Sequence, residues 1–342
     1  MRLITLAVVL VIACTARAAE LPLVALFATG GTIQSKGTHR LTLAEYNESR
    51  VSPVELLADL PELKSLARIE VTEISNVGSG SINTERLLKL TKAITAELAR
   101  PEVVGAVVTH GTGTLEETAF FLHLTVKSDK PVVVVGAMRP FTAISRDGPY
   151  NLYNAVRVAI TPEAVGKGVL VVLNDTIHSA RFVTKGHTYH VETFVSRELG
   201  PLGFVDTDRV VLDRNLLTRH TAKSEFDVST LEELPQVDIV YGYQEASAAT
   251  IPALVADGAK GIVSADNSPA YNRAFLAAQS QGVIIVSGDR KGAGRVTVSD
   301  SAAARSRITS DNLNPQKARI LLRLALTRTS ETREIQRIFN EY

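Results

Sequence analysis

The sequence predicts an α/β protein with a larger N-terminal domain, built on a doubly wound parallel sheet, and a smaller C-terminal α/β domain. Two observations predict this fold class. Short, almost wholly apolar runs recur along the chain, as expected of strands that helices cover on both faces of a sheet. Amphipathic segments with helical spacing lie between these runs. With 342 residues, 45% of them hydrophobic, the chain is long enough to bury two cores.

The N-terminal domain is predicted from five apolar runs that alternate with helical patterns. The clearest helix is 84–99, in which leucine and isoleucine side chains recur every three or four positions and therefore share one face. The expected strands are 23–28, 69–74, 106–109, 132–135 and 169–173, and the helix face consists of Leu87, Leu90, Ile94 and Leu98.

A change in texture separates the two domains. From about 204 to 235 the residues are mostly polar and show little periodicity, which is typical of a long connection. Strand and helix patterns then resume. We expect a catalytic domain over 19–213, a linker over 214–235 and a second domain over 236–342. The expected elements of that second domain are strands 239–243, 261–264 and 283–286 and a final helix at 315–327.

The first 18 residues have the pattern of a secretory signal peptide. Arg2 precedes a short apolar run, and Ala16-Arg17-Ala18 offers small residues at a cleavage site. We therefore expect a periplasmic or secreted protein. Cys14, the one cysteine of the chain, lies inside this segment, so the mature chain is expected to have no disulfide. Cys14 also resembles the end of a lipoprotein signal, and lipidation there is the alternative, the one way in which we expect the protein to be held at a membrane.

Composition and motifs argue against several classes of partner. A net charge of +1 gives no reason to expect nucleic acid as a partner. Neither a dinucleotide-binding glycine pattern nor a phosphate-binding loop occurs, so we expect no nucleotide cofactor. His187 and His190 are three residues apart, but no glutamate completes a zinc-binding pattern around them. We therefore expect no metal.

Four polar clusters follow four of the predicted strands. In parallel sheets, ligands bind beyond the carboxyl ends of the strands, so clusters at successive strand ends predict a single site. The clusters are 29–32, 76–79, 110–114 and 136–140.

Within these clusters, threonine hydroxyls are the candidate nucleophiles. Thr32 and Thr112 each come directly after a glycine at a strand end. A hydroxyl needs an activating base, and no G-x-S-x-G elbow supplies the usual partners. Tyr46 and Lys185 lie in polar, loop-like surroundings and are candidate bases, although either needs a perturbed pKa to act at neutral pH. The residues alone leave the choice between them open.

The polar clusters and the segments around them resemble the type II, periplasmic L-asparaginases and glutaminase-asparaginases, and the resemblance extends over almost the whole mature chain. So many collinear blocks make chance agreement negligible. The matching blocks are ATGGTI (28–33), VTHGTGTLEET (108–118), DKPVVVVGAMRP (129–140), DGPYNLYNAV (147–156), GVLVVLNDTIHSARFVTK (168–185), GPLG (200–203) and LNPQKARILLRLALT (313–327).

The resemblance implies hydrolysis of side-chain carboxamides to a carboxylate and ammonia. It implies that Thr32 is the nucleophile, with Tyr46 on a flap that assists it. Thr112 and Lys185 are implied to form a second hydroxyl–amine pair that relays a proton. No cofactor is implied.

The resemblance also implies how the substrate is held. Ser79 and the backbone around Ala137 match substrate-contacting positions of the family. The family works as a homotetramer of two tight dimers, in which the neighbouring smaller domain completes each site. Gln244 and Glu245 fall near that contributing loop, and we expect Glu245 to bind substrate.

The chain departs from the family pattern inside the predicted substrate site. Gly113 stands where the family has an aspartate that pairs with the α-amino group of the substrate, and Gly80 stands where the family usually has a hydrogen-bonding side chain. The stretch SADNSP (264–269) replaces a glycine-rich loop, and only Asp300 is left to match a further family carboxylate.

Three functions remain open from the sequence. In the first, another carboxylate such as Glu245 of a partner subunit replaces the aspartate missing at Gly113. The protein then hydrolyses L-asparagine or, like some members of the family, also L-glutamine. In the second, the substrate is a small amide without an α-amino group, because a buried ammonium without a counter-charge is costly. In the third, the protein binds a ligand in the periplasm without catalysis.

Overall fold

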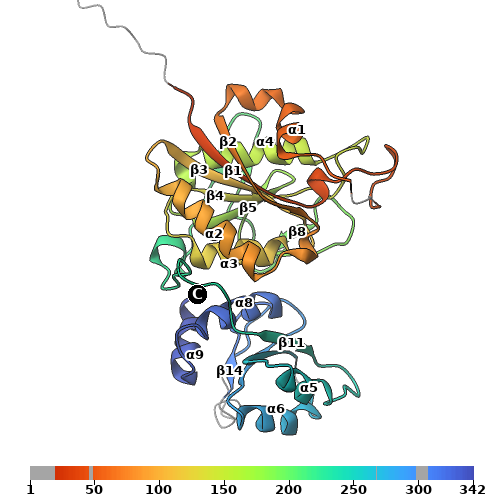
Figure 1. The fold of residues 1–342 in the computed structure, drawn as a ribbon, viewed down its shortest axis with the longest axis vertical. Coiled ribbons are helices and arrows are strands. Elements are labelled where there is room, and N and C mark those ends of the chain that lie inside the picture. Colours follow the sequence, from red (N-terminus) through yellow and green to blue (C-terminus); the bar gives the residue numbers. More distant parts are fainter. Residues whose placement is uncertain (1–19, 46–48, 267, 298–306) are drawn as a thin grey trace, which may run out of the picture.

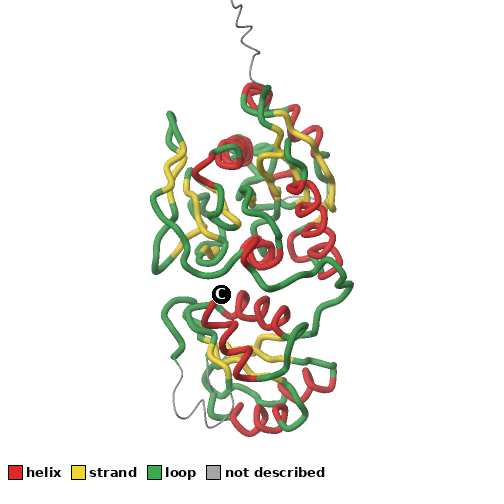
Figure 2. The backbone as a smooth tube through the Cα atoms, turned by 90° about the vertical axis from the view of Figure 1, so that its left-hand side faces the viewer, coloured by secondary structure: helices red, strands yellow, loops and turns green. Residues whose placement is uncertain are grey.

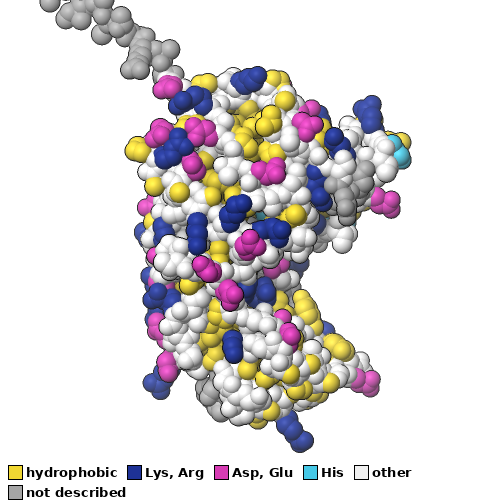
Figure 3. Space-filling view, viewed as in Figure 1, with side chains coloured by type: hydrophobic (Ala, Val, Ile, Leu, Met, Phe, Trp, Pro, Cys, Tyr) yellow, Lys and Arg dark blue, Asp and Glu magenta, His cyan; other side chains and the backbone are white. Residues whose placement is uncertain are grey.

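The computed structural model describes residues 20–45, 49–266, 268–297 and 307–342. These residues form two lobes, with the N-terminal domain above and the C-terminal domain below in the orientation of Figure 1. In both views the end of the chain lies at the junction of the lobes (Figures 1 and 2). The space-filling view shows the surface indented on one side between them (Figure 3).

The N-terminal domain is built on a sheet in which the described residues supply eight strands, in the order β10-β9-β6-β5-β4-β3-β1-β2. The first five strands in chain order pair in parallel, and the last three extend the sheet in antiparallel fashion. The bounds are β1 (Leu23–Gly30), β2 (Arg68–Val77), β3 (Val103–Thr109), β4 (Val132–Val135), β5 (Val169–Leu173), β6 (Thr176–Ser179), β9 (Gly203–Val205) and β10 (Val210–Leu212).

Helices cover both faces of this sheet. One buried cluster joins the sheet to α2 (Thr84–Ala99) and α3 (Leu115–Thr125). A second cluster joins the opposite face to α1 (Pro53–Ala58) and α4 (Gly148–Ala159). Figure 1 shows these pairs on opposite sides of the strands. The predicted doubly wound α/β domain is therefore confirmed.

The strand order reverses between β1 and β3, because β2 lies on one side of β1 and β3 on the other. Loops that leave two such strands diverge to opposite faces of the sheet, and a crevice forms at that point. Thr32 follows β1 and Thr112 follows β3. The fold thus places both candidate nucleophiles at its natural ligand-binding position.

The C-terminal domain has a parallel sheet in the order β11-β12-β13-β14. A buried cluster packs this sheet against α5 and α6, and another packs it against α8 and α9. The bounds are β11 (Val237–Tyr241), α5 (Thr250–Ala256), β12 (Gly261–Ala265), α6 (Tyr271–Gln279), β13 (Ile284–Gly288), β14 (Ile308–Thr309), α8 (Pro315–Ala325) and α9 (Thr332–Glu341).

The connection between the domains is more structured than expected. The polar stretch from about 204, expected to belong to a long connection, begins with β9 and β10, which pair as a short hairpin. Further along, Phe226 and Val228 are buried in a cluster that also contains Phe120 of α3 and Leu321 of α8. A shared apolar core therefore holds the two domains together.

Two short strands form a separate hairpin, β7 (Val183–Lys185) and β8 (Phe194–Ser196). Three-residue strands carry no clear alternation in the sequence, which is why this hairpin was not predicted. In the described part of the chain, no helix is long and apolar enough to cross a membrane.

Candidate active site

Thr32 begins a single helical turn, Thr32–Gln34, directly after β1. Its side chain is mostly buried, with 5% of the residue exposed. The turn is fixed by Gln34, whose amide nitrogen donates to the carbonyl of Val51 over 2.9 Å and whose amide oxygen accepts from the N–H of Gly30. Thr32 is therefore presented by a rigid turn at the end of a central strand.

The two glycines before Thr32 are required by close backbone packing. Gly31 has φ of 84°, and a Cβ there would lie 2.2 Å from Cα of Gly111. At Gly30, with φ of 99°, a Cβ would lie 2.4 Å from N of Val77. The turns after β1 and β3 thus touch backbone to backbone, which puts Thr32 and Thr112, the residues that follow Gly31 and Gly111, at neighbouring positions.

His110 fixes the turn that carries Thr112. Its Nδ1 donates to the carbonyl of Gly111 over 2.8 Å, and its Nε2 lies 2.9 Å from Oγ1 of Thr118 on α3. Burial lowers the pKa of His110 to about 4, so the ring is neutral at pH 7. The neutral ring accepts the Thr118 hydroxyl hydrogen at Nε2 and ties the turn to the first turns of α3.

Lys185 is the last residue of β7, and its side chain reaches the turn that carries Thr112. Its Nζ donates to Oγ1 of Thr112 over 2.9 Å. Burial alone lowers the pKa of the Lys185 amine, without a contribution from a neighbouring charge. A lysine amine that has given up its proton is a base, and the lowered pKa makes that form easier to reach, so the pair has the elements of proton transfer. The predicted juxtaposition of Thr112 and Lys185 is seen in the structure.

Ser79 brings the loop after β2 to the same place. Its backbone carbonyl accepts from Oγ1 of Thr114 over 2.9 Å. A Cβ on Gly111 would lie 2.9 Å from Cβ of Ser79, and one on Gly113 would lie 2.8 Å from Oγ of Ser79. Gly113 is exposed, and so is Gly80, where nothing lies within 4 Å of an added Cβ. This part of the site therefore has backbone in place of side chains, with open space at Gly80, whereas a side chain at Gly113 would require the Ser79 hydroxyl to move.

Ala137 is buried in the turn after β4. The turn is held by two side chains of the helix that follows it, which the sequence reasoning did not single out. Asp147 accepts from the backbone N–H of Met138 over 2.8 Å, and Asn151 donates to the carbonyl of Gly136 over 3.0 Å. Both belong to the block DGPYN, so the signal was present in the sequence but carried no assigned role.

Glu245, a predicted substrate-binding residue, is not joined to this cluster. Glu245 is exposed on the loop after β11, in the C-terminal domain, with φ of 59°. No hydrogen bond between described residues links it to the threonines. Tyr46, Asp300 and Cys14 lie outside the described residues.

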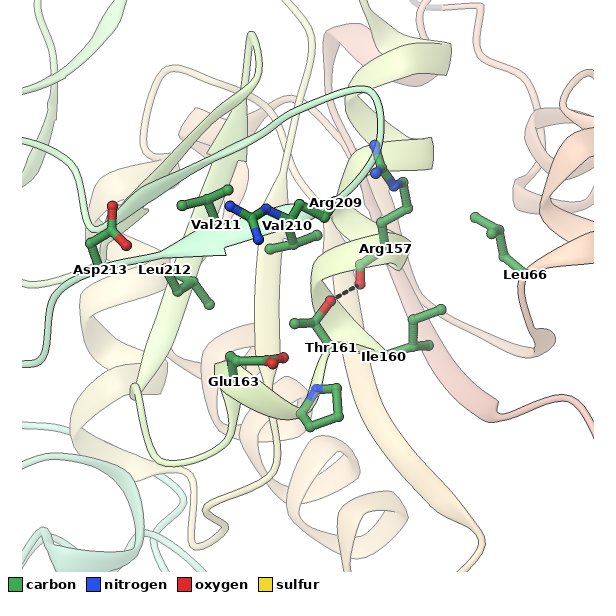
Figure 4. Close-up of a pocket in the computed structure, with 11 residues that line it drawn as sticks. Leu66, Arg157, Ile160, Thr161, Glu163, Arg209, Val210, Val211, Leu212 and Asp213 are labelled. Carbon is green, nitrogen blue, oxygen red and sulfur yellow. Dashed lines mark hydrogen bonds between the residues drawn. The ribbon is translucent and has the colours of Figure 1, made fainter.

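A different hollow lies at the opposite edge of the sheet. It has a volume of about 540 Å³ and is lined by the C-terminal end of α4 and by β10. Figure 4 shows Arg157, Thr161 and Arg209 around it, with Thr161 donating to the carbonyl of Arg157. None of the predicted site residues lines this hollow. The convergence of polar groups therefore selects the other edge, where Thr32 and Thr112 lie.

The fold and the cluster define a class of protein, an α/β enzyme with a hydroxyl–amine site at the switch point of a parallel sheet. Comparison with known proteins makes the class specific. Residues 23–218 match the family description "Asparaginase, N-terminal", and residues 236–339 match "Glutaminase/Asparaginase C-terminal domain".

Individual relatives agree with these family matches. L-asparaginase 2 of Bacillus subtilis (strain 168) is 49% identical over 328 residues, which is 94% of this chain and 87% of that protein. A protein of Haemophilus influenzae named "Probable L-asparaginase periplasmic" is 43% identical over 96% of this chain and 95% of its own length. The crystal structure of a probable cytoplasmic L-asparaginase from Campylobacter jejuni superposes with a TM-score of 0.88 at 42% identity, covering 94% of this chain and 100% of that one.

The chain belongs to the asparaginase/glutaminase family and is a hydrolase of amides.

Proposed function

We propose that the protein hydrolyses the side-chain amide of L-asparagine to L-aspartate and ammonia, with Thr32 as the nucleophile. The observation that carries the proposal is the 2.9 Å bond from Lys185 to Thr112, directly beside the turn of Thr32. It supplies a half-buried amine and a hydroxyl next to a second hydroxyl, which is what attack by a weak nucleophile requires.

In the proposed reaction, Oγ of Thr32 forms a bond to the amide carbon and its proton leaves toward a base. The C–N bond then breaks, the nitrogen takes up a proton and leaves as ammonia. Water, deprotonated toward the Lys185–Thr112 pair, adds to the ester, and Thr32 is released with the carboxylate product. Backbone N–H groups of the glycine turns would stabilise the negative oxygen of each tetrahedral intermediate. Tyr46 is proposed to assist from a lid over the substrate.

The test is ammonia release by the mature chain from residue 19, with L-asparagine and L-glutamine as substrates. Thr32→Ala is expected to lose turnover with both, whereas Thr207→Ala, at an exposed turn between β9 and β10, keeps it. Full activity in Thr32→Ala would overturn the assignment of the nucleophile without changing the family membership.

A second candidate substrate is a small amide without an α-amino group. It is favoured by the lack of a side chain at Gly113 and by the absence of any charge contribution to the pKa of Lys185 among the described residues. Succinamic acid, which is asparagine without its α-amino group, tests this candidate in the same assay. A higher kcat/KM for succinamic acid than for asparagine would establish it.

We further propose a homotetramer of two tight dimers, in which Glu245 of one subunit enters the site of its neighbour. The exposure of Glu245 on a loop of the smaller domain supports this, because an exposed carboxylate is free to meet another subunit. Light scattering is expected to give four times the mass of the mature chain. Glu245→Gln is expected to raise the KM for asparagine, and an unchanged KM would remove Glu245 from the site.

We propose that residues 1–18 direct export to the periplasm. The name of the Haemophilus relative supports this location, although the Campylobacter protein is named cytoplasmic. The intact mass of the protein isolated from its own cells is expected to equal that of a chain that begins at Ala19. A mass equal to that of a chain that begins at Cys14 and carries lipid would show that the protein is a lipoprotein instead.

A further inference from the structure

A second pocket lies beside the candidate active site, between the two domains. It has a volume of about 360 Å³. Its walls are the first turns of α2 and α3 and one face of α8, and Figure 1 shows α2 and α3 facing α8 across the junction. Ser79 and Gly80 also line it, so one loop borders both this pocket and the amide site. We call it the interdomain pocket.

Two arginines of α8 line the interdomain pocket, and both are held by neutral groups. Nε of Arg319 donates to the carbonyl of Val237 over 2.7 Å. Nε of Arg323 donates to the carbonyl of Pro235 over 3.0 Å, and its Nη2 donates to Oγ1 of Thr84 over 2.8 Å. Neither arginine takes part in an ion pair between described residues. Their terminal nitrogens therefore bring positive charge to the pocket without a carboxylate bound to them.

The two charges are close enough to disturb each other. Arg323 is only 8% exposed, and burial lowers its pKa to about 10; the charge of Arg319 acts in the same direction, and the charge of Asp238, which forms no ion pair with Arg323 among the described residues, acts against it. Taking a charge out of water without an opposite charge is costly. A bound anion would offset that cost for both arginines.

One carboxylate of the chain faces the same pocket. Glu117 of α3 lines it, and burial raises the pKa of this carboxyl while Arg319 opposes the rise. Among the residues that line the pocket, one carboxylate and two guanidinium groups leave a net charge of +1. The first turns of α2 and α3 end on the same pocket, and helix N-termini add partial positive charge.

We propose that the interdomain pocket is a binding site for a small monocarboxylate anion, held by Arg319 and Arg323. A guanidinium group matches a carboxylate with two parallel hydrogen bonds. A single negative charge balances the net charge of the residues that line the pocket. The second negative charge of a dianion would have no counter-charge there and would be repelled by Glu117. Because Ser79 borders both sites, an occupied pocket also fixes the loop that the amide contacts.

The test uses the full mature chain and does not depend on amide turnover. Thermal unfolding is followed in sodium acetate and in sodium chloride at equal ionic strength. Acetate is expected to raise Tm in a saturable way by about 2 °C over chloride. Arg319→Gln is expected to lose this rise, and Arg333→Gln, an exposed arginine of α9, is expected to keep it.

Several outcomes would overturn the proposal. A rise that persists in Arg319→Gln would place acetate in the amide site or on the general surface. Inorganic phosphate that gives an equal rise, also lost in Arg319→Gln, would overturn the preference for a monocarboxylate. Should Arg319→Gln fail to fold, Arg319→Lys keeps the charge without the planar fork. That variant is then expected to need about tenfold more acetate for the same rise, and an unchanged requirement would contradict the site.

Discussion

The two walls of the proposed amide site are built in opposite ways. One wall, which we call the chemical wall, consists of Thr32, Thr112 and Lys185 and is buried or half-buried. The other, the glycine wall, consists of Gly80 and Gly113 and is exposed, without side chains. The contrast teaches that the fold fixes the groups that we propose to break the amide, whereas the groups that would recognise the rest of the substrate are not fixed by it.

The rigidity of the chemical wall has identifiable causes. The turn of Thr32 is locked by Gln34, and that of Thr112 is locked by His110. Catalytic groups held in place by buried hydrogen bonds need little rearrangement when charge develops. At the glycine wall, in contrast, a Cβ on Gly113 meets only the hydroxyl of Ser79. Its backbone has no conformation reserved for glycine, so a larger residue is sterically admissible there.

The largest expected effect comes from the chemical wall. Lys185→Met removes the proposed base while keeping the length of the side chain, and kcat is expected to fall by roughly 10²- to 10⁴-fold with a smaller change in KM. Initial rates of ammonia release measure both constants. Lys89→Met, at an exposed position of α2, is the matched control. A loss in KM alone would mean that Lys185 binds substrate rather than moving a proton.

The pH dependence of stability tests the support of the chemical wall. The pKa of His110 is about 4 in the folded protein, below the ordinary 6.5. Its neutral form therefore stabilises the fold above pH 6.5, and this contribution is lost as pH falls from 6.5 toward 4. The expected loss is about 3 kcal/mol. Urea unfolding at several pH values measures it.

Other groups titrate in the same range, so the comparison needs variants. His110→Gln is expected to flatten the fall in unfolding free energy relative to the wild type. His190→Gln, at an exposed position of the β7–β8 loop, is expected to leave the slope unchanged. Equal slopes in all three proteins would show that His110 is protonated without cost.

The chemical wall was largely predictable from the sequence, and the reason is local. Glycine–threonine turns directly follow apolar runs, and parallel strands bring their carboxyl ends to one edge. Elements with a strong pattern were predicted with their observed bounds. These are the apolar runs 132–135 and 169–173 and the helix 84–99, whose apolar residues recur every three or four positions. The bond from Lys185 to Thr112 was an expectation of resemblance, since β7 is too short to be recognised by its pattern.

The interdomain pocket could not be predicted in the same way. Thr84, Glu117 and Arg323 are far apart in the chain and meet only because the domains share an apolar core. The residues 226 and 228 within the predicted linker belong to that core, although the polar sequence around them hides their role. Packing between domains depends on the shape of whole surfaces, and no local periodicity of the sequence indicates which surfaces will meet.

The glycine wall is tested by restoring a charge. Gly113→Asp is expected to raise the preference for L-asparagine over succinamic acid by about 10- to 100-fold, because the carboxylate pairs with the α-ammonium group. The ratio of kcat/KM values for the two substrates is the measurement. Gly113→Asn has nearly the same size without the charge and is expected to leave the ratio nearly unchanged. Equal shifts in both variants would mean that bulk, not charge, decides.

The smallest effect is expected where the two walls meet. Thr114→Val keeps the shape of the side chain but removes the 2.9 Å hydrogen bond to the carbonyl of Ser79. One lost hydrogen bond is worth about 1 kcal/mol, so KM is expected to rise about fivefold for asparagine and succinamic acid alike, with kcat little changed. Thr230→Val, at an exposed position, is the control. A fall in kcat instead would show that the loop of Ser79 reaches the reacting amide. The residues around Thr114 would then belong to the chemical wall, and the two walls would not be separate there.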